Sequence, residues 1–479
     1  MKVAGVYPQF LRSTDRAGLS YEEPSGLGYV LASLEEAGHS VKLMVPVKEV
    51  TADGKVESTS KADFLNEIVK YEPDVVALSL MTPQANNGIE LARKIKEINP
   101  NITIVAGGYH PSACPDIVSK ENGIDVAVIG EGERTMVELM AALKRKKGLG
   151  KVKGIAFLEN GKLKLTGERE RIVELDSLPR PIHSEVLRKQ KDISLVYPEP
   201  SKQKGFASIS YSRGCPGNCR FCAEPSMYHR RVQYRSAKSM VNEIEDLIKT
   251  GVSNFTFNDT NFTANKGKVL EFCSEIMKRG IKTNFATMAS INSTDEEMID
   301  AMANAGFKKI AWGIEALSPD TLKSVNKPIK NSKTREVLKA AADRGILNTG
   351  LFMIGFENQD KNAILKEVER LKGYDLHRLR IAISTPLPGS AWHKEAVQSG
   401  EKLSTDTNLY DTEHLVYEHP SISAKEMTGI RSKALANFYH TGEYERRMKD
   451  VTRRFPHYRG TLNEYYATLP KGVRPKFRL

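Results

Sequence analysis

The 479-residue sequence has no apolar run long enough to cross a membrane, and it contains only five cysteines. A membrane-spanning helix needs ~20 mainly apolar residues, whereas the apolar runs here extend over only a few residues each. Residues 1–8 are also too short for the apolar core of a secretory signal and are typical of a first strand. We therefore expect a cytoplasmic protein without a membrane partner. In such a reducing compartment, clustered cysteines are typical of metal ligands and not of a disulfide framework.

The composition excludes a largely disordered chain, because 40% of the residues are hydrophobic and 27% are charged. Lysine and arginine exceed aspartate and glutamate by 71 to 59, and residues 430–479 contribute 12 against 4. This basic carboxyl-terminal region could meet an acidic partner, although a solvated basic surface is the simpler interpretation. No base-reading motif accompanies it, so we expect no nucleic-acid partner.

The amino-terminal part of the chain alternates short apolar runs with amphipathic stretches. Short runs rich in valine and isoleucine are typical of parallel strands that are covered on both faces. The runs lie at residues 2–7, 41–45, 75–80, 102–106 and 126–129. They predict an α/β domain over residues 1–148 with a doubly wound, Rossmann-like sheet. Ligands bind such sheets at the carboxyl ends of the strands, so the loops there are the places to search for a site.

The alternation stops at residues 149–204. A turn at residues 159–162 between two short apolar runs predicts a hairpin, and the prolines further along indicate an extended linker. A second series occupies residues 205–390, and its six repeats of strand and helix predict a partial (β/α)6 barrel of the TIM type. Residues 391–479 are expected to form a mostly helical, basic region.

Three cysteines follow the first strand of the second series. Cys215, Cys219 and Cys222 have the spacing C-x3-C-x2-C. Thiolates are soft ligands, and one loop with this spacing can hold three irons of a [4Fe–4S] cluster. The two remaining cysteines have no cluster-like neighbours, so we expect one iron to stay open for a small molecule. The alternative is a structural zinc site completed by His229, although such sites more often join two short Cys/His knuckles from separate segments.

This spacing, with Phe221 directly before the third cysteine, resembles the radical S-adenosylmethionine (SAM) superfamily. The resemblance implies that SAM binds the open iron and is cleaved reductively to a 5′-deoxyadenosyl radical. It also implies that Phe221 lies against the adenine, and that Asp259 and Glu315, which end two predicted strands, lie near SAM. For both carboxylates the alternative is a cap on the following helix. No further catalytic residue is assigned.

Two glycine-containing segments end predicted strands of the first domain, GGYHP at residues 107–111 and GEGE at residues 130–133. Paired glycines let the backbone approach a flat ligand, while the dinucleotide fingerprint G-x-G-x-x-G is absent. In this order before the cysteine motif, the segments resemble the cobalamin-binding domain found upstream of many radical SAM enzymes. The resemblance implies that a cobalamin site, which receives the nucleotide tail, includes Ser79, Thr82, Gly107, Gly108, His110, Gly130, Gly132 and Glu133.

The loop after the first strand lacks the motif D-x-H-x-x-G, whose histidine ligates cobalt in other cobalamin proteins. We therefore expect no imidazole on the lower face of cobalt, which suits methyl transfer to a carbon radical. Gln9, Phe10 and Leu11 are candidates, by position alone, for the residue that faces cobalt. For His110 the alternative is a structural hydrogen bond that holds its loop.

Together these resemblances imply a cobalamin-dependent radical SAM C-methyltransferase that transfers a methyl group from methylcobalamin to an unactivated carbon. Its size and layout resemble the methanogen enzymes that C-methylate a glutamine of methyl-coenzyme M reductase, so a peptide of the alpha subunit is an expected substrate. An electron donor such as ferredoxin or flavodoxin is implied as well.

Two alternatives stay open at this point. A cyclase or oxidoreductase could use the same cofactors without methyl transfer, and a corrinoid-binding carrier or regulator could bind cobalamin alone. A methylthiotransferase is disfavoured, because that family carries three cluster cysteines in its amino-terminal domain, where this chain has only Cys114.

Overall fold

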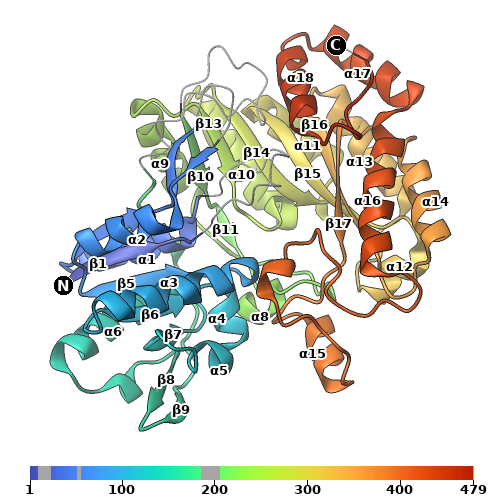
Figure 1. Cartoon of the computed structure of the whole chain (residues 1–479). Helices are drawn as coiled ribbons and strands as arrows, with labels where there is room; N and C mark the ends of the chain where they lie inside the picture. The colour runs from blue at the N-terminus through green and yellow to red at the C-terminus, as the bar shows by residue number, and fades with distance from the viewer. Residues whose placement is uncertain (9–22, 51–55, 185–204, 478) are drawn as a thin grey trace.

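The computed structural model describes residues 1–8, 23–50, 56–184, 205–477 and 479. A seven-stranded sheet, a six-stranded sheet and a group of helices follow one another along the chain (Figure 1). This order confirms the predicted α/β class, with a Rossmann-like first domain, a parallel second sheet and a helical carboxyl-terminal region. Within the described part, no helix combines the length and the apolar character that a membrane crossing requires.

The first sheet has the strand order β2-β1-β5-β6-β7-β8-β9, and its first five members run parallel. Val3 belongs to the core beneath two helices on one face, and Ala4 belongs to the core on the other face. Because successive side chains of a strand point to opposite faces, a continuous apolar run fills both layers. The elements are β1 (Lys2–Val6), β2 (Ser40–Met44), β5 (Val75–Ser79), β6 (Thr103–Gly107) and β7 (Val126–Val128), with helices α1 (Ser25–Glu36) and α6 (Gly132–Arg145) on one face and α2 (Lys61–Lys70) and α3 (Ala85–Ile98) on the other.

Shorter elements surround this sheet. They are the antiparallel pair β3 (Val47–Val50) and β4 (Val56–Ser58), the 3-10 turns η1 (Thr82–Gln84) and η2 (Leu149–Lys151), and the short helices α4 (Tyr109–Ala113) and α5 (Pro115–Val118). The hairpin predicted for the linker joins the sheet, since β8 (Ile155–Glu159) pairs antiparallel with β7 and β9 (Lys162–Leu165) pairs with β8. Ile155 and Phe157 enter the same core as helix α6. The first sheet therefore extends past residue 148, because β8 covers the backbone edge that β7 would otherwise expose.

The second sheet has the order β10-β13-β14-β15-β16-β17, and every pair in it is parallel. Polar residues cap several of its helices. The side chains of Ser236, Asn265, Asp295 and Asp360 each accept a backbone hydrogen bond from the first turn of the helix that follows. The elements are β10 (Phe206–Ile209), α9 (Ala237–Lys249), β13 (Asn254–Phe257), η5 (Phe262–Ala264), α10 (Lys266–Lys278), β14 (Asn284–Ser290), η6 (Ile291–Ser293), α11 (Glu296–Ala305), β15 (Phe307–Glu315), α12 (Pro319–Ser324), α13 (Asn331–Asp343), β16 (Leu347–Ile354), α14 (Lys361–Leu371) and β17 (Arg378–Ile383).

The two faces of the second sheet differ. Phe257, Ile310, Trp312 and Ile381 belong to one large core together with side chains of the covering helices. Residues that alternate with these along the strands point to the opposite face, which we call the inner face. It corresponds to the interior of the partial barrel.

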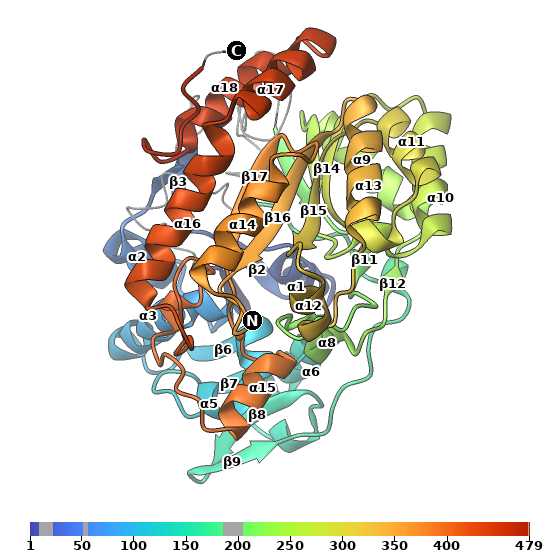
Figure 2. The same ribbon diagram turned by 90° about the vertical axis from the view of Figure 1, so that its right-hand side faces the viewer.

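The carboxyl-terminal helices belong to the same core as the second sheet. They are α15 (Ala391–Gln398), α16 (Ala424–Tyr439), α17 (Gly442–Arg454) and α18 (Tyr458–Thr468), with η7 (Thr407–Leu409) before α16. Tyr439 closes the outer edge of β17, because its hydroxyl accepts from Leu379 N at 2.8 Å and lies 3.1 Å from Leu379 O. Figure 2 shows α16 running beside β17.

The first domain lies against the carboxyl ends of the second sheet. Asn258, directly after β13, donates to Ser25 Oγ of α1 at 2.7 Å, and Arg235 donates to the hydroxyl of Tyr29 in the same helix at 3.2 Å. The chain between the sheets includes η3 (Leu175–Ser177), and the part at residues 185–204 lies outside the described residues. Both sets of strand-end loops thus meet at one junction.

Candidate cluster and cofactor site

The cysteine loop begins just after β11 (Ser212–Arg213), which pairs with β12 (Gln233–Tyr234). Gly214 needs to be glycine, because its φ is +86° and a side chain there would collide with the carbonyl of Arg231. A side chain at Gly217 would begin 3.4 Å from Cys215 Sγ and 3.8 Å from Cys219 Sγ. The loop thus folds around a glycine with two of the predicted ligand sulfurs on either side of it.

The three cysteines of the loop form a donor set that fits iron. All are half-buried, and burial raises the pKa of each, that of Cys222 to about 12. The thiolates of Cys215 and Cys219 would also repel that of Cys222. Three like charges in one loop need a cation among them, and a bound metal deprotonates a coordinating thiol outright. This donor set fits a [4Fe–4S] cluster held by Cys215, Cys219 and Cys222.

The zinc alternative fails on geometry. His229 is not turned toward the sulfurs, since its Nε2 lies 2.9 Å from Glu168 Oε1. Among the residues that the structure describes, no three His, Cys, Asp or Glu side chains group as a single metal ion requires. Ligands of a cube bind separate irons and therefore stand farther apart than ligands of one ion.

Glu315 lies beside the cysteine loop. Strand β15 bulges between Gly313 and Glu315, and Glu315 has a φ of +62°, a conformation that costs energy outside glycine. Its Oε1 accepts from Lys327 Nζ at 2.5 Å, and the positive charge of Lys327 acts on Cys215 and Cys219. Glu315 caps no helix, because Ser318 caps α12. The contact of Glu315 with SAM stays a prediction. No local sequence motif predicted that Lys327 would lie beside the cysteine loop.

Asp259 holds the start of the cysteine loop. The buried carboxylate accepts from Tyr211 N at 3.0 Å, from Ser212 N at 2.6 Å and from Ser212 Oγ at 2.5 Å. Burial raises its pKa to about 6. The described contacts therefore position the loop, and a contact with SAM stays a prediction. Phe221 lies at the edge of a small aromatic cluster, 6.3 Å from Phe356 between ring centroids, and its contact with adenine is likewise untested.

The predicted cobalamin glycines fall into two kinds. Gly130 has no atom within 4 Å of where a side chain would begin, and Gly107 has only Val128 Cβ at 3.7 Å. Gly108 has a φ of +102° and approaches the carbonyl of Leu80, and Gly132 packs on Val30. Gly107 and Gly130 therefore leave an open cradle at the strand ends that suits a flat ligand, and the φ of +76° at Gly130 also requires glycine, whereas backbone conformation and packing explain Gly108 and Gly132.

The remaining predicted cobalamin residues gather at this cradle. Ser79 lies opposite Gly107 in the sheet register, and His110 Nδ1 lies 3.3 Å from Thr82 Oγ1. Burial, with a smaller effect of the charge of His393, lowers the pKa of His110 to about 4. His110 is therefore neutral at pH 7, and its observed contact is the structural one. Gln9, Phe10 and Leu11 lie outside the described residues.

Arg213 clamps the cysteine loop to the first domain. Its Nη1 donates to Glu131 Oε1 at 2.8 Å, its Nη2 donates to Glu133 Oε1 at 2.6 Å, and its guanidinium lies 4.8 Å above the ring of Tyr29. All three polar side chains are nearly inaccessible to solvent. The carboxylate of Glu133, predicted to contact cobalamin, is engaged here by Arg213.

A second contact joins the two domains through Glu224 in α8 (Glu224–Tyr228), directly after the third cysteine. Tyr109 of the GGYHP segment donates its hydroxyl to Glu224 Oε2 at 2.5 Å, and Thr260 donates to Glu224 Oε1 at 2.8 Å. Burial raises the pKa of Glu224. Each predicted cobalamin segment thus makes a direct contact beside the predicted cluster.

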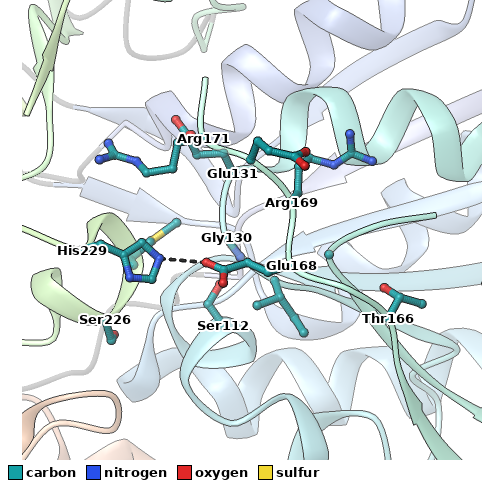
Figure 3. A pocket seen from close by; sticks show the side chains of 13 residues that line it. Ser112, Gly130, Glu131, Thr166, Glu168, Arg169, Arg171, Ser226 and His229 are labelled. Atoms are coloured by element: carbon teal, nitrogen blue, oxygen red, sulfur yellow. Dashed lines mark hydrogen bonds and ion pairs between the residues drawn. The ribbon is translucent and has the colours of Figure 1, made fainter. Parts of the chain in front are cut away.

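A cavity of about 260 Å³ opens at this junction between Gly130, Ser112, α8 and residues 166–171 (Figure 3). The His229–Glu168 pair closes one side of it. Arg171 donates from Nη1 to the carbonyls of Tyr228 and Arg231, while its Nε and Nη2 are buried without a hydrogen-bond partner.

Comparison with known families agrees with this geometry. Residues 19–140 match the B12 binding domain, and residues 209–371 match the Radical SAM superfamily. The chain therefore belongs to the B12-binding radical SAM enzymes, and its cofactors are cobalamin, a [4Fe–4S] cluster and SAM. The radical SAM match excludes a corrinoid carrier or regulator without enzymatic activity.

Individual relatives show the same layout. An uncharacterized methyltransferase of Pyrococcus horikoshii is 28% identical over 443 residues, which cover 92% of each chain. An anaerobic magnesium-protoporphyrin IX monomethyl ester cyclase of Rubrivivax gelatinosus is 27% identical over 78% of this chain and 66% of its own. The solved structure of the cobalamin-dependent SAM radical enzyme OxsB has a TM-score of 0.69 at 16% identity, covering 98% of this chain and 78% of OxsB, which shows a shared fold.

Proposed function

We propose that this enzyme is a C-methyltransferase that moves a methyl group to an unactivated carbon. The observation that supports the proposal is the direct attachment of the cobalamin segments to the cysteine loop, through Arg213 with Glu131 and Glu133 and through Tyr109 with Glu224. Methyl transfer needs both cofactors to face one substrate, whereas separate functions would need no such attachment. The relative from Pyrococcus horikoshii is also described as a methyltransferase.

The cofactors supply a 5′-deoxyadenosyl radical and a methyl group to this junction. The residues of the chain position them. Asp259 fixes the backbone before Cys215, and Arg213 holds the same loop against the first domain. Lys327 places a positive charge beside the cysteine sulfurs, where it offsets the negative charge of the thiolates. Buried contacts on both sides of the loop limit the access of water to a reactive radical.

A glutamine of methyl-coenzyme M reductase is our candidate methyl acceptor, with ferredoxin or flavodoxin as electron donor. The layout of the chain supports it, whereas the basic carboxyl-terminal region supports it less than its charge indicates. Arg447 and Arg474 donate to carbonyls of the chain itself, and Arg454 pairs with Asp343. Part of the positive charge of this region is therefore engaged in contacts within the chain.

The test is anaerobic reconstitution with iron, sulfide, cobalamin and SAM, followed by incubation with a peptide of the alpha subunit that contains the glutamine. We expect S-adenosylhomocysteine together with 5′-deoxyadenosine, and a peptide heavier by one CH2 group in mass spectrometry. Cys219→Ala is the matched control and should give neither 5′-deoxyadenosine nor the heavier peptide. Turnover without a methylated product of any candidate acceptor would contradict methyl transfer.

An oxidative cyclase is the second candidate, because the Rubrivivax gelatinosus relative carries that description over 78% of this chain. A cyclase would form 5′-deoxyadenosine without S-adenosylhomocysteine. The ratio of these two products therefore separates the candidates even before the substrate is known.

A further inference from the structure

Three polar residues lie on the inner face of the second sheet, on the adjacent strands β15, β16 and β17. Ile310 and Trp312 point to the helices, so Lys309 and Ala311 point inward. Ala311 is level with Thr349, and Leu351 is level with Arg380. Lys309, Thr349 and Arg380 therefore form a diagonal row across neighbouring strands, within reach of one another for long side chains.

None of the three has a partner among the described residues. Thr349 Oγ1 is buried and makes no hydrogen bond. Lys309 is half-buried and Arg380 is exposed, and no described carboxylate forms an ion pair with either. Burial and the positive charges of Arg378 and Arg380 lower the pKa of Lys309 to about 7, and no negative charge of the described residues opposes them.

Such an arrangement is unfavourable in the free protein. A buried hydroxyl without a hydrogen bond and a desolvated ammonium beside another cation both cost free energy. A carboxylate or phosphate would reverse each cost, because its oxygens accept hydrogen bonds from all three groups and its charge neutralises the cations. Unsatisfied polar groups in a native structure often mark such a ligand site.

We propose that Lys309, Thr349 and Arg380 anchor an anionic group of the substrate, a carboxylate or a phosphate. This inference rests on the proposed function, since it takes the inner face as the place where a substrate lies.

The position of the row explains how an anchored substrate would reach the chemistry. Lys309 is six residues before Glu315 on β15, or about 20 Å along the strand, and Arg380 is level with Gly313, about 7 Å before Glu315. Met288, level with Ala311 on the inner face, is 39% exposed and offers an apolar surface between the two. The row therefore runs from about 20 Å to about 7 Å before Glu315, and an anionic group held between Lys309 and Arg380 would let the rest of the molecule extend toward the cysteine loop.

The first experiment measures anion binding by the reconstituted holoenzyme with isothermal titration, using inorganic phosphate in one arm and succinate in the other. We expect one of the two probes to bind, and Lys309→Met and Arg380→Met to weaken its Kd at least about tenfold, or ~1.4 kcal/mol. Lys425→Met, which removes an exposed lysine of α16, is the matched control and should leave the Kd unchanged. Equal affinity in Lys309→Met and the wild type, or binding of neither probe, would overturn the anchor.

A second measurement needs no variant. An amine with a pKa of about 7 is about half neutral at pH 7, far more than a surface lysine, so Lys309 should acylate faster than surface lysines. The bound probe should slow this acylation at Lys309 alone, as read by peptide mass spectrometry. Unchanged acylation would contradict the proposal. Neither readout depends on methyl transfer, so an anchor that binds anions in an enzyme that methylates nothing would refute only the proposed function.

Discussion

The carboxyl-end loops and the inner face of the second sheet differ in how their cationic side chains are paired. At the carboxyl ends, Arg213 is paired with two glutamates and Lys327 is paired with Glu315. On the inner face, Lys309 near the amino end of β15 and Arg380 in the middle of β17 form no ion pair with a described carboxylate. A cation that is paired within the chain holds the protein together, whereas a cation left without a partner is available to a ligand. The difference separates the positioning of cofactors from the recognition of substrate.

Among changes at the carboxyl-end loops, Cys219→Ala should have the largest effect. Removing one of three thiolates leaves two ligands for a cluster that needs three, so we expect loss of iron and sulfide and of SAM cleavage altogether. Iron and sulfide analysis and quantification of 5′-deoxyadenosine after anaerobic reconstitution check this. Cys114→Ala removes a buried cysteine of the first domain and should keep the cluster. A full cluster in Cys219→Ala would refute the assignment.

Arg213→Met should have the next largest effect. It leaves Glu131 and Glu133 buried without their cation, and breaking a buried pair in this way costs about 3–5 kcal/mol in free energy of unfolding. Denaturant titration measures the loss. The triple variant with Glu131→Gln and Glu133→Gln should regain part of it, because no uncompensated charge remains. A loss below ~1 kcal/mol would show that the clamp is not formed.

The pH dependence of stability tests another buried cation, His183, which lies beside Glu23 and Glu243. Burial lowers the pKa of His183, but Glu23 and Glu243 outweigh it and raise the pKa to about 9. This contribution is complete below the unfolded pKa of 6.5 and is lost as pH rises toward 9. The full loss corresponds to about 3 kcal/mol. Unfolding free energies between pH 6 and 9 should fall in the wild type and stay flatter in His183→Gln.

The smallest effect is expected on the inner face, and it should have the opposite sign. Lys309→Met removes an unpaired cation beside Arg380, so the free energy of unfolding at pH 7 should rise by up to ~1 kcal/mol. The difference between wild type and variant should shrink above pH 7, where Lys309 is already neutral. Destabilisation by Lys309→Met would contradict the contrast between the carboxyl-end loops and the inner face.

Several features could be predicted from the sequence because they depend on neighbouring residues. The spacing of Cys215, Cys219 and Cys222 lies within eight residues, and strand alternation with amphipathic helices specifies the α/β class. The glycines at the ends of two strands also marked the open cradle at Gly107 and Gly130, because a missing side chain is a local property.

Only the tertiary structure decided which charges meet. Arg213 and Glu133 are 80 residues apart, and nothing in either segment specifies the other. The same holds for the hairpin that joined the first sheet and for the row of Lys309, Thr349 and Arg380, which depends on the register of three strands. Local periodicity determines which element forms, but burial and pairing depend on what packs against it, and long-range contacts set that.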